Sequence, residues 1–402
     1  MHKKGVTDVM KIDAPNKMGY TFFLVMALIS SSQMSNPYAF LVTCLALVCL
    51  TFLQKETLPR SYFLFTILVF GISLLGMIFE LNAEVVTRIL MTCALIPLVF
   101  LIDLRKHPQA LDFATKFMGL SLALAIIGFL YALAGGADLF RLINPDGREL
   151  LLFLSTFSNS NFPIGGGHII RPSFIFDEPG AYTFAIDTIL LINLMVYRKL
   201  RGIDWFLIIG GLITFSIAHI LVCCLIVFAA RKSKLLFIPA CAISGIDYLL
   251  YLSSGVSQII DRFTVVDGAL AGDNRSKLFE RAFDLVVEHP YGMGGICNWD
   301  ISSCFDIYGG FGENPAFPAA YYGIMAASAY YLIFFIIVSL IVISALKLNR
   351  FWMLTSLAIL ALIAQRPFLF NIGYNLQILL IFSMLLKTIT LKKTPVATND
   401  KH

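Results

Sequence analysis

Long apolar runs, separated by short stretches that carry Lys and Arg, recur along almost the whole chain. The run from Tyr62 to Phe79 is typical, and about 20 apolar residues suffice to cross a bilayer as one helix. Of the 402 residues, 58% are hydrophobic and 14% are charged, against about 45–50% and about 25% in soluble domains. This pattern indicates a multi-pass membrane protein and argues against a soluble enzyme, a nucleic-acid-binding protein and a disordered chain.

Twelve segments have the composition of transmembrane helices, and the sequence therefore predicts an all-α polytopic integral membrane protein. They lie near residues 19–34, 37–53, 62–79, 85–103, 113–134, 180–197, 204–216, 218–230, 235–253, 315–345, 352–365 and 367–386. Helices 1–5 thus fall within residues 19–134, helices 6–9 within 180–253 and helices 10–12 within 315–386. Residues 135–179 and 254–314 are expected to form two large periplasmic loops, and residues 1–18 and 387–402 to form cytoplasmic tails.

The positions of Lys and Arg favour two short helices, rather than one long helix, between Asp204 and Ala230. With a break near residues 216–219, 21 of the 30 basic residues fall on the cytoplasmic side, as the positive-inside rule requires. The nine others are nearly all arginines, whose planar fork suits phosphate and carboxylate groups. They are Arg88, Arg141, Arg148, Arg171, Arg262, Arg275, Lys277, Arg281 and Arg366.

Two of the eight cysteines, Cys297 and Cys304, fall in the second predicted loop. A periplasmic position would expose both to an oxidising compartment, so the sequence predicts a disulfide between them. The other six lie within predicted spans, where cysteine acts as a small apolar side chain. The six histidines show no paired ligand spacing, so no metal site and no cofactor are expected.

The end of the first loop contains an arginine and two acids just before a predicted helix. Three consecutive glycines, at residues 165–167, precede Arg171 and permit a close approach of the backbone to a ligand. Arg171 is therefore expected to contact an anion. Asp177 and Glu178 precede Pro179, so they either favour the positive end of that helix or take part in chemistry.

The second loop is expected to contain one helix, from about Arg275 to Glu288, capped by Asp273 and Asn274. Its predicted apolar stripe consists of Leu278, Phe279, Ala282 and Val286. Arg275 lies at the end of this stripe and is expected to face an anionic partner. Arg281 lies on the opposite, charged face, where i,i+3 and i,i+4 pairs are typical.

Glu313 and His289 are candidate general bases in the same loop. Glu313 follows a glycine-rich stretch, where burial would raise its proton affinity, although a helix-start cap is an equally simple role. His289 precedes Pro290, a position typical of a polar contact at the end of a helix. Within the spans, Asp187, Ser216 and His219 are costly polar groups that are expected to be partnered or to line a cavity.

Three motifs, in this order, resemble Wzy-type O-antigen polymerases and the related O-antigen ligases. They are the segment from Arg171 to Pro179 before a helix, the break at Thr214–Ser216, and Arg275 followed by the stretch Pro290–Gly294. The resemblance implies an inverting, metal-independent glycosyltransferase in the bacterial inner membrane, with its active site facing the periplasm. Its substrates would be undecaprenyl-pyrophosphate-linked oligosaccharides, as donor and acceptor, and a flippase and a chain-length regulator would be partners.

The resemblance also implies roles for individual residues. Arg171, Arg275 and Arg281 would bind the pyrophosphate, with Glu313 as the leading base and Glu178 and His289 as alternatives. His168, Ser216, His219 and Asn314 would line the cavity. Ligases have a His-Asn pair where this chain has Glu313-Asn314, which favours a polymerase. An O-antigen ligase and, from another class, a transporter or flippase of lipid-linked sugars stay as alternatives.

Overall fold

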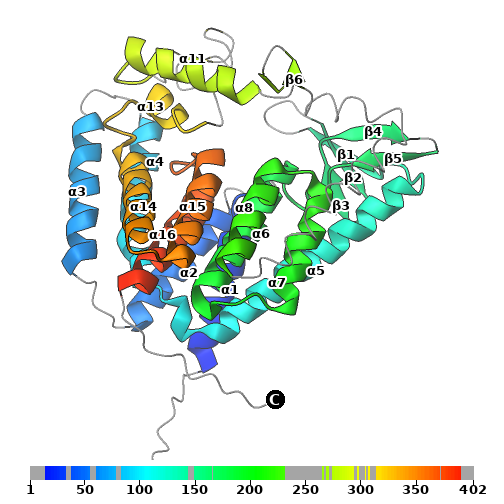
Figure 1. The fold of residues 1–402 in the computed structure, drawn as a ribbon, viewed down its shortest axis with the longest axis horizontal. Helices are drawn as coiled ribbons and strands as arrows, with labels where there is room; N and C mark the ends of the chain where they lie inside the picture. Colours follow the sequence, from blue (N-terminus) through cyan, green and yellow to red (C-terminus); the bar gives the residue numbers. More distant parts are fainter. Residues whose placement is uncertain are drawn as a thin grey trace, which may run out of the picture.

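The computed structural model describes residues 14–32, 38–54, 60–77, 83–143, 149–164, 166–230, 265–266, 269–270, 274–293, 297, 304, 307, 314–371 and 373–390. Across these residues the chain is mostly helical, and most of its helices form one bundle (Figure 1). The helices of the N-terminal half are α1 (Ala14–Ile29), α2 (Tyr38–Gln54), α3 (Arg60–Met77), α4 (Ala83–Leu101), η1 (Leu104–Lys106), α5 (Pro108–Leu133) and α6 (Pro179–Tyr197). Those that follow are α7 (Gly202–Gly210), η2 (Gly211–Thr214), α8 (Ile217–Ala229), α11 (Asn274–Glu288), α13 (Phe317–Tyr322), α14 (Ser328–Leu346), α15 (Arg350–Gln365) and α16 (Tyr374–Thr390).

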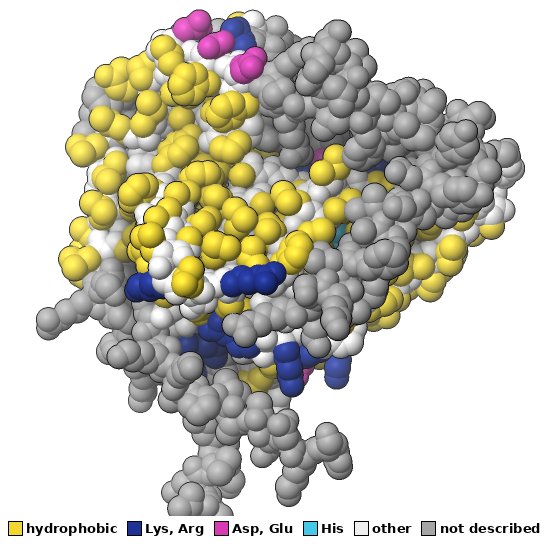
Figure 2. Space-filling model, in the orientation of Figure 1, with side chains coloured by type: hydrophobic (Ala, Val, Ile, Leu, Met, Phe, Trp, Pro, Cys, Tyr) yellow, Lys and Arg dark blue, Asp and Glu magenta, His cyan; other side chains and the backbone are white. Residues whose placement is uncertain are grey.

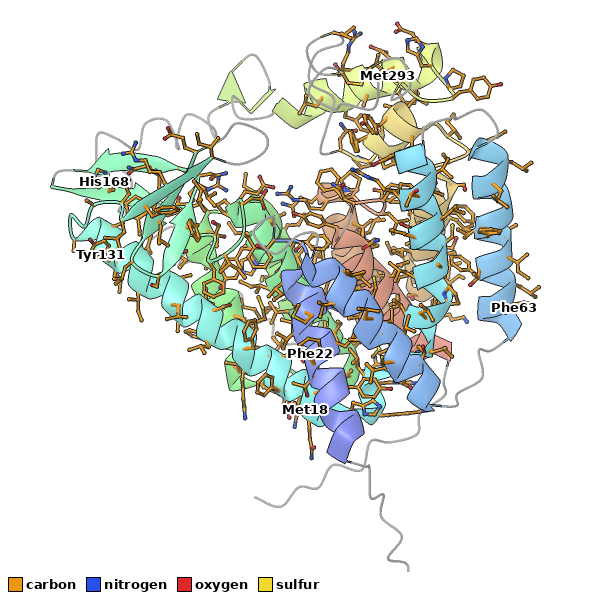
Figure 3. The ribbon with its side chains drawn as sticks, turned by 180° about the vertical axis from the view of Figure 1, so that it is seen from behind. Met18, Phe22, Phe63, Tyr131, His168 and Met293 are labelled. Atoms are coloured by element: carbon orange, nitrogen blue, oxygen red, sulfur yellow. A yellow bond between two sulfur atoms is a disulfide. The ribbon has the colours of Figure 1, made fainter. Side chains whose placement is uncertain are left out.

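Four helical segments among the described residues are long and apolar enough to cross a membrane: Val86–Lys106, Pro108–Leu133, Pro179–Tyr197 and Ser328–Leu346. Seven further apolar helices are shorter. Large apolar side chains such as Met18, Phe22 and Phe63 point outward from the bundle (Figure 3), with 79%, 46% and 55% of their surface exposed. These features are compatible with a membrane location. The number of twelve spans stays a prediction, and the predicted span at 235–253 lies outside the described residues.

The predicted span at 315–345 is wrong as a single helix, because the chain turns at Gly323 between α13 and α14. Gly323 has φ +87°, a conformation that side chains with a Cβ rarely adopt. Its backbone packs against that of Gly292, which has φ +92°, and a Cβ on either glycine would lie 2.5 Å from a backbone atom of the other segment. The Met293 N–H also donates to the Ala320 carbonyl at 2.9 Å. The part of this motif that the structure describes, Pro290–Met293, therefore docks the end of α11 onto α13.

The first loop is not irregular, as an all-α class would require, but folds into small antiparallel sheets. A three-stranded sheet has the order β1 (Phe140–Ile143), β2 (Glu149–Phe153), β3 (Thr156–Ser158), and a hairpin joins β4 (Asn161–Ile164) to β5 (Gly167–Ile170). Leu151, Phe153 and Ile170 bury their side chains against Ala132 near the end of α5. This apolar contact fixes the strand that leads into Arg171.

A short two-residue pairing also occurs in the second loop, between β6 (Val265–Val266) and β7 (Ala269–Leu270). The predicted helix there is α11, which begins one residue earlier than expected. Its buried face is rotated from the predicted one: Ala282 and Leu285 are fully buried, whereas Phe279 is 44% exposed. The packing against α13 and the bond from the Asn314 side chain to the Leu278 carbonyl, at 3.3 Å, set this orientation.

Basic side chains from several helices meet at one end of the bundle. The Arg198 guanidinium, just after α6, lies 3.9 Å from the ring centroid of Trp352 at the start of α15. Partial burial, with the nearby charge of Arg105, lowers the pKa of Arg198 to about 10. Arg105 in turn donates to the Lys387 carbonyl of α16 at 3.1 Å. We call this region the basic end.

Figure 2 shows a broad hydrophobic surface with Lys and Arg side chains along its lower edge and acidic side chains above it. Lys347, just after α14, and Arg350, the first residue of α15, are exposed, and the rings of the two residues after Arg350 contact the Arg198 guanidinium. Chain segments that the sequence assigns to the cytoplasmic side thus do lie together. This arrangement is the one that the positive-inside rule predicts, and the assignment to the cytoplasm stays a prediction.

The structure joins Cys297 and Cys304 by a disulfide, with their Cα atoms 5.1 Å apart, which is the predicted pairing. In denatured, unreduced protein we expect alkylation to leave these two cysteines unmodified, whereas Cys44, Cys49, Cys93, Cys223 and Cys224, which are free thiols, react. After reduction Cys297 and Cys304 should react as well. Peptide mass spectrometry measures both, and alkylation of either residue without reductant would contradict the pairing.

Candidate functional site

The candidate site lies at the N-terminal end of α6, at the opposite end of this helix from Arg198 and the basic end. Pro179 is the first residue of α6, and its fixed φ suits that position. The segment 171–178, the break before α8 and the end of α15 all reach this helix end. The first turn of a helix presents N–H groups and a partial positive charge, which favour anions.

Arg171 follows β5 and contacts the break between η2 and α8. Its Nε donates to the Thr214 carbonyl at 3.1 Å and its Nη2 to the Phe215 carbonyl at 3.5 Å. These carbonyls lie at the C-terminal end of a helical segment, where carbonyls lack helical partners and carry partial negative charge. The Arg171 backbone N–H donates to Ser158 Oγ of β3 at 3.2 Å. The small sheets thus position this guanidinium.

The chain breaks at Phe215 and Ser216, at the start of the predicted interval 216–219. Phe215 has φ +52°, and Ser216 is the N-cap of α8, accepting from the His219 N–H at 3.5 Å. Ser216 Oγ and the Thr183 hydroxyl of α6 form a hydrogen bond at 3.2 Å. Ser216 is 5% exposed, so it ties the break to α6 within the protein interior.

Arg366 is a site residue that sequence reasoning missed. It caps the C-terminal end of α15, is 4% exposed and forms an ion pair with Glu178. A Cβ on Gly180 would lie 2.6 Å from Arg366 Nη2, so glycine at that position permits the guanidinium to approach α6. The sequence did contain a signal for Arg366, because an arginine between two apolar spans is by default a candidate functional residue.

Short contacts connect the two arginines across the first turns of α6. Arg171 binds the carbonyls of residues 214 and 215, Ser216 bonds to Thr183, Thr183 donates to the Gly180 carbonyl at 3.2 Å, and Gly180 packs against Arg366. Glu178 was a candidate base or cap. Its side chain makes no N-cap hydrogen bond to α6 and pairs with Arg366, so the site brings together two guanidinium groups and the Glu178 carboxylate.

The other candidate residues of the second loop lie elsewhere or outside the described part. Glu313 is outside it, and so is the side chain of Arg275, whose backbone belongs to α11. Arg281 is half-buried on α11, and the His289 N–H donates to the Leu285 carbonyl at 2.8 Å. Asn314 accepts from the Ala316 N–H at 3.0 Å and joins α11 to α13, so its described bonds are structural.

His168 lies in the β4–β5 hairpin, opposite Pro163 (Figure 3). None of the contacts given by the described residues links it to Arg366 or to Ser216. The placement of His168 in the cavity, which the resemblance implied, therefore stays a prediction.

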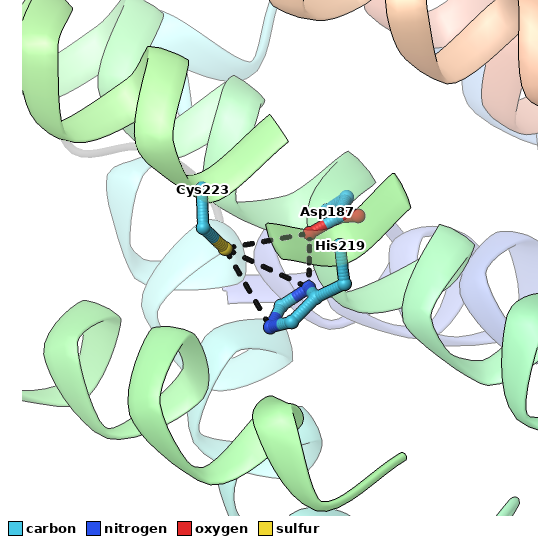
Figure 4. A group of neighbouring side chains, drawn as sticks. All are labelled: Asp187, His219 and Cys223. Carbon is cyan, nitrogen blue, oxygen red and sulfur yellow. Dashed lines mark hydrogen bonds and ion pairs between the residues drawn. The ribbon is translucent and has the colours of Figure 1, made fainter. Parts of the chain in front are cut away.

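His219, predicted to be partnered or to line a cavity, is fully buried in a cluster with Asp187 of α6 and Cys223 of α8 (Figure 4). Its Nδ1 lies 2.7 Å from Asp187 Oδ1, and its Nε2 lies 3.2 Å from the Ile208 carbonyl oxygen. The Cys223 Sγ lies 3.6 Å from Nδ1 and 3.9 Å from Oδ1. Cys223 was not predicted as a partner, although it follows His219 by four residues and therefore lies on the same helix face.

The described residues form a mostly helical protein that is compatible with a membrane location. The candidate site, with Arg171 and Arg366, lies at one end of α6, and the basic end lies at the other. No protein-family model matches the chain, and no curated protein matches its sequence.

Proposed function

We propose that the protein is a glycosyltransferase of the O-antigen polymerase type. It joins undecaprenyl-pyrophosphate-linked oligosaccharide repeat units at the periplasmic face of the bacterial inner membrane. The observation that carries the proposal is the pair Arg171 and Arg366 at the N-terminal end of α6, on the side away from the basic end. The motifs that resemble the polymerase family include the segment that leads to this helix end.

The chemistry of such a donor fits two guanidinium groups. Pyrophosphate is already a leaving group, so catalysis mainly requires stabilisation of the charge that develops on it as the glycosidic carbon is attacked. One guanidinium group can bind two phosphate oxygens at once. The attraction between its charge and the phosphate is stronger away from bulk water. Arg366 is 4% exposed, so it meets this condition. A polyprenyl carrier would reach the site sideways from the bilayer.

A general base must deprotonate the acceptor hydroxyl. Glu313 is our first candidate, and His289 is an alternative. Glu178 is less suited to this role because its carboxylate is engaged with Arg366, and we assign it to orienting that guanidinium. Glu313→Gln should accumulate single repeat units, whereas retained polymerisation would remove Glu313 from the mechanism without affecting the arginine assignment.

Arg171→Ala should remove long glycan chains at unchanged protein level, because it deletes one cation of the pyrophosphate site. Electrophoresis of surface glycans from a complemented knockout strain measures the chain-length ladder. Arg141→Ala is the matched control: Arg141 belongs to the same loop, its side chain is 62% exposed and it pairs with Asp138 at 2.8 Å. A wild-type ladder from Arg171→Ala would overturn the assignment.

The broken helix formed by α7, η2 and α8 favours a second candidate, a transporter of lipid-linked sugars, since transporters build their sites on broken helices. The knockout distinguishes the candidates. Glycans with one repeat unit on the lipid core indicate a polymerase, whereas a bare core indicates a flippase or a ligase defect.

A further inference from the structure

We propose that Asp187, His219 and Cys223 form a binding site for one divalent metal ion of the zinc class, inside the helix bundle. The three side chains come from two helices, α6 and α8, and their ligand atoms all lie within 4.8 Å of one another (Figure 4). Each residue is at most 1% exposed. This site is separate from the arginines, because Asp187 lies one turn beyond Thr183 along α6.

The distances within the cluster are close to those around a tetrahedral zinc ion. Ligand atoms that bind zinc at about 2.0–2.3 Å lie about 3.3–3.6 Å from one another. The Cys223 Sγ lies 3.6 Å from His219 Nδ1 and 3.9 Å from Asp187 Oδ1, but it also lies 3.5 Å from Nε2, so it faces the side of the imidazole ring. The Nδ1···Oδ1 separation, 2.7 Å, is shorter, as expected when a proton occupies the position of the metal. To bind an ion at Nδ1, the carboxylate would move away from the imidazole and the thiol would turn toward the plane of the ring.

The protons of the cluster can be replaced without a change of charge. The Ile208 carbonyl only accepts, so His219 Nε2 carries a hydrogen. The contact between Nδ1 and Oδ1 then requires a second proton, and the thiol carries a third. A divalent ion would displace the last two, leaving a neutral imidazole, a carboxylate and a thiolate. The total charge is zero before and after, which is what burial without external counterions demands.

Two features outside the ligand set support metal binding. Metal-binding histidines usually donate their other ring N–H to a carbonyl or carboxylate, which fixes the ring, and Ile208 provides that carbonyl at 3.2 Å. Gly211 leaves room for the ring, since a Cβ there would lie 2.3 Å from His219 Nε2. Asp187 Oδ2 is buried and has no hydrogen-bond partner among the described residues, so it is available as a fourth donor atom.

The donor set selects the metal. One imidazole nitrogen, one thiolate and one carboxylate suit zinc and its analogue cobalt, whereas magnesium and calcium prefer oxygen ligands alone. The ion would link α6 to the first turns of α8, next to the break whose carbonyls bind Arg171. Its role would be structural, so the site is compatible with glycosyl transfer that uses no metal.

Metal analysis of the purified full chain in detergent tests the proposal. Protein expressed with zinc should contain about one zinc per chain by elemental analysis, and protein expressed with cobalt should show a thiolate-to-cobalt charge-transfer band. Cys223→Ser should lose that band, and His219→Gln should lose the metal. Cys224→Ser is the matched control, because Cys224 is the next residue, is a free thiol and lies outside the cluster.

Wild-type protein that binds neither zinc nor cobalt overturns the proposal, as does a cobalt band that survives Cys223→Ser or disappears in Cys224→Ser. Should Cys223→Ser fail to fold, the zinc-edge X-ray absorption spectrum of the wild type decides, since it must show one sulfur ligand. None of these measurements uses glycan synthesis, so they stand apart from the test of the proposed function.

Discussion

Arg366→Ala is expected to abolish long glycan chains, with a loss of about 10²–10³-fold in polymerisation rate, the typical effect of removing one group that stabilises transition-state charge. The variant also leaves the Glu178 carboxylate, whose side chain is 14% exposed, without its ion-pair partner. Breaking such a buried pair costs about 3–5 kcal/mol, so the protein level must be measured with the ladder. Electrophoresis of surface glycans and quantitative immunoblotting of membranes provide both.

Two further variants separate a loss of function from a loss of folding. Arg366→Lys keeps the charge next to Glu178 but removes the planar fork, so it should accumulate normally and still make shorter chains. Arg350→Ala changes an exposed arginine at the other end of the same helix, α15, and should leave the ladder unchanged. Normal chain lengths from Arg366→Ala would exclude Arg366 from the site.

Gly323→Ala and Gly292→Ala should each lower the thermal stability strongly, or prevent the protein from accumulating. Both residues have positive φ, and an added Cβ would lie 2.5 Å from a backbone atom of the partner segment. The unfavourable conformation alone costs about 1–3 kcal/mol, and the backbone has to separate to relieve the clash. Melting of the purified protein, followed by fluorescence-detected size exclusion, measures the shift.

Gly71→Ala is the control for this pair. Gly71 lies within α3, and no atom lies within 4 Å of the position that its Cβ would take. Alanine favours the helix over glycine by up to about 1 kcal/mol, so this variant should melt at the wild-type temperature or slightly above it. A normal melting temperature for Gly323→Ala would show that α11 and α13 do not depend on the contact between the two glycines.

Much of the helical layout follows from local patterns in the sequence. Apolar runs predicted the positions of most described helices to within about five residues, as for α6, expected at 180–197 and found at Pro179–Tyr197. The span expected at 367–386 fits less well, because α16 is found at Tyr374–Thr390. The break before α8 was predicted from charge, because only two short elements kept the later basic residues on one side. These features depend on the composition of each segment and on the distribution of Lys and Arg along the chain, and both can be read from the sequence.

The missed features depend on contacts between distant segments. The turn at Gly323 exists because Gly292, 31 residues earlier, packs against it. The pairing of Glu178 with Arg366 joins positions 188 residues apart, and the link between Asp187 and His219 joins two helices. The strands β1–β5 were also missed, and apolar residues of β2 and β5 pack with Ala132 near the end of α5. A single sequence does not show which of many possible partners is chosen.

The burial of α6 among other helices affects how the protein can fold while it is being synthesised. Of the four helices long enough to span a membrane, α6 has the lowest mean hydropathy, 1.4, and the largest buried share, 89%. Its polar groups bond to partners synthesised later, such as Gln377 of α16, which Thr188 contacts at 3.3 Å, and Arg366, which pairs with Glu178. Because the chain is synthesised from its N-terminus, α6 is complete before Arg366 and Gln377 exist, so its polar groups can form these bonds only after residue 377 has been made.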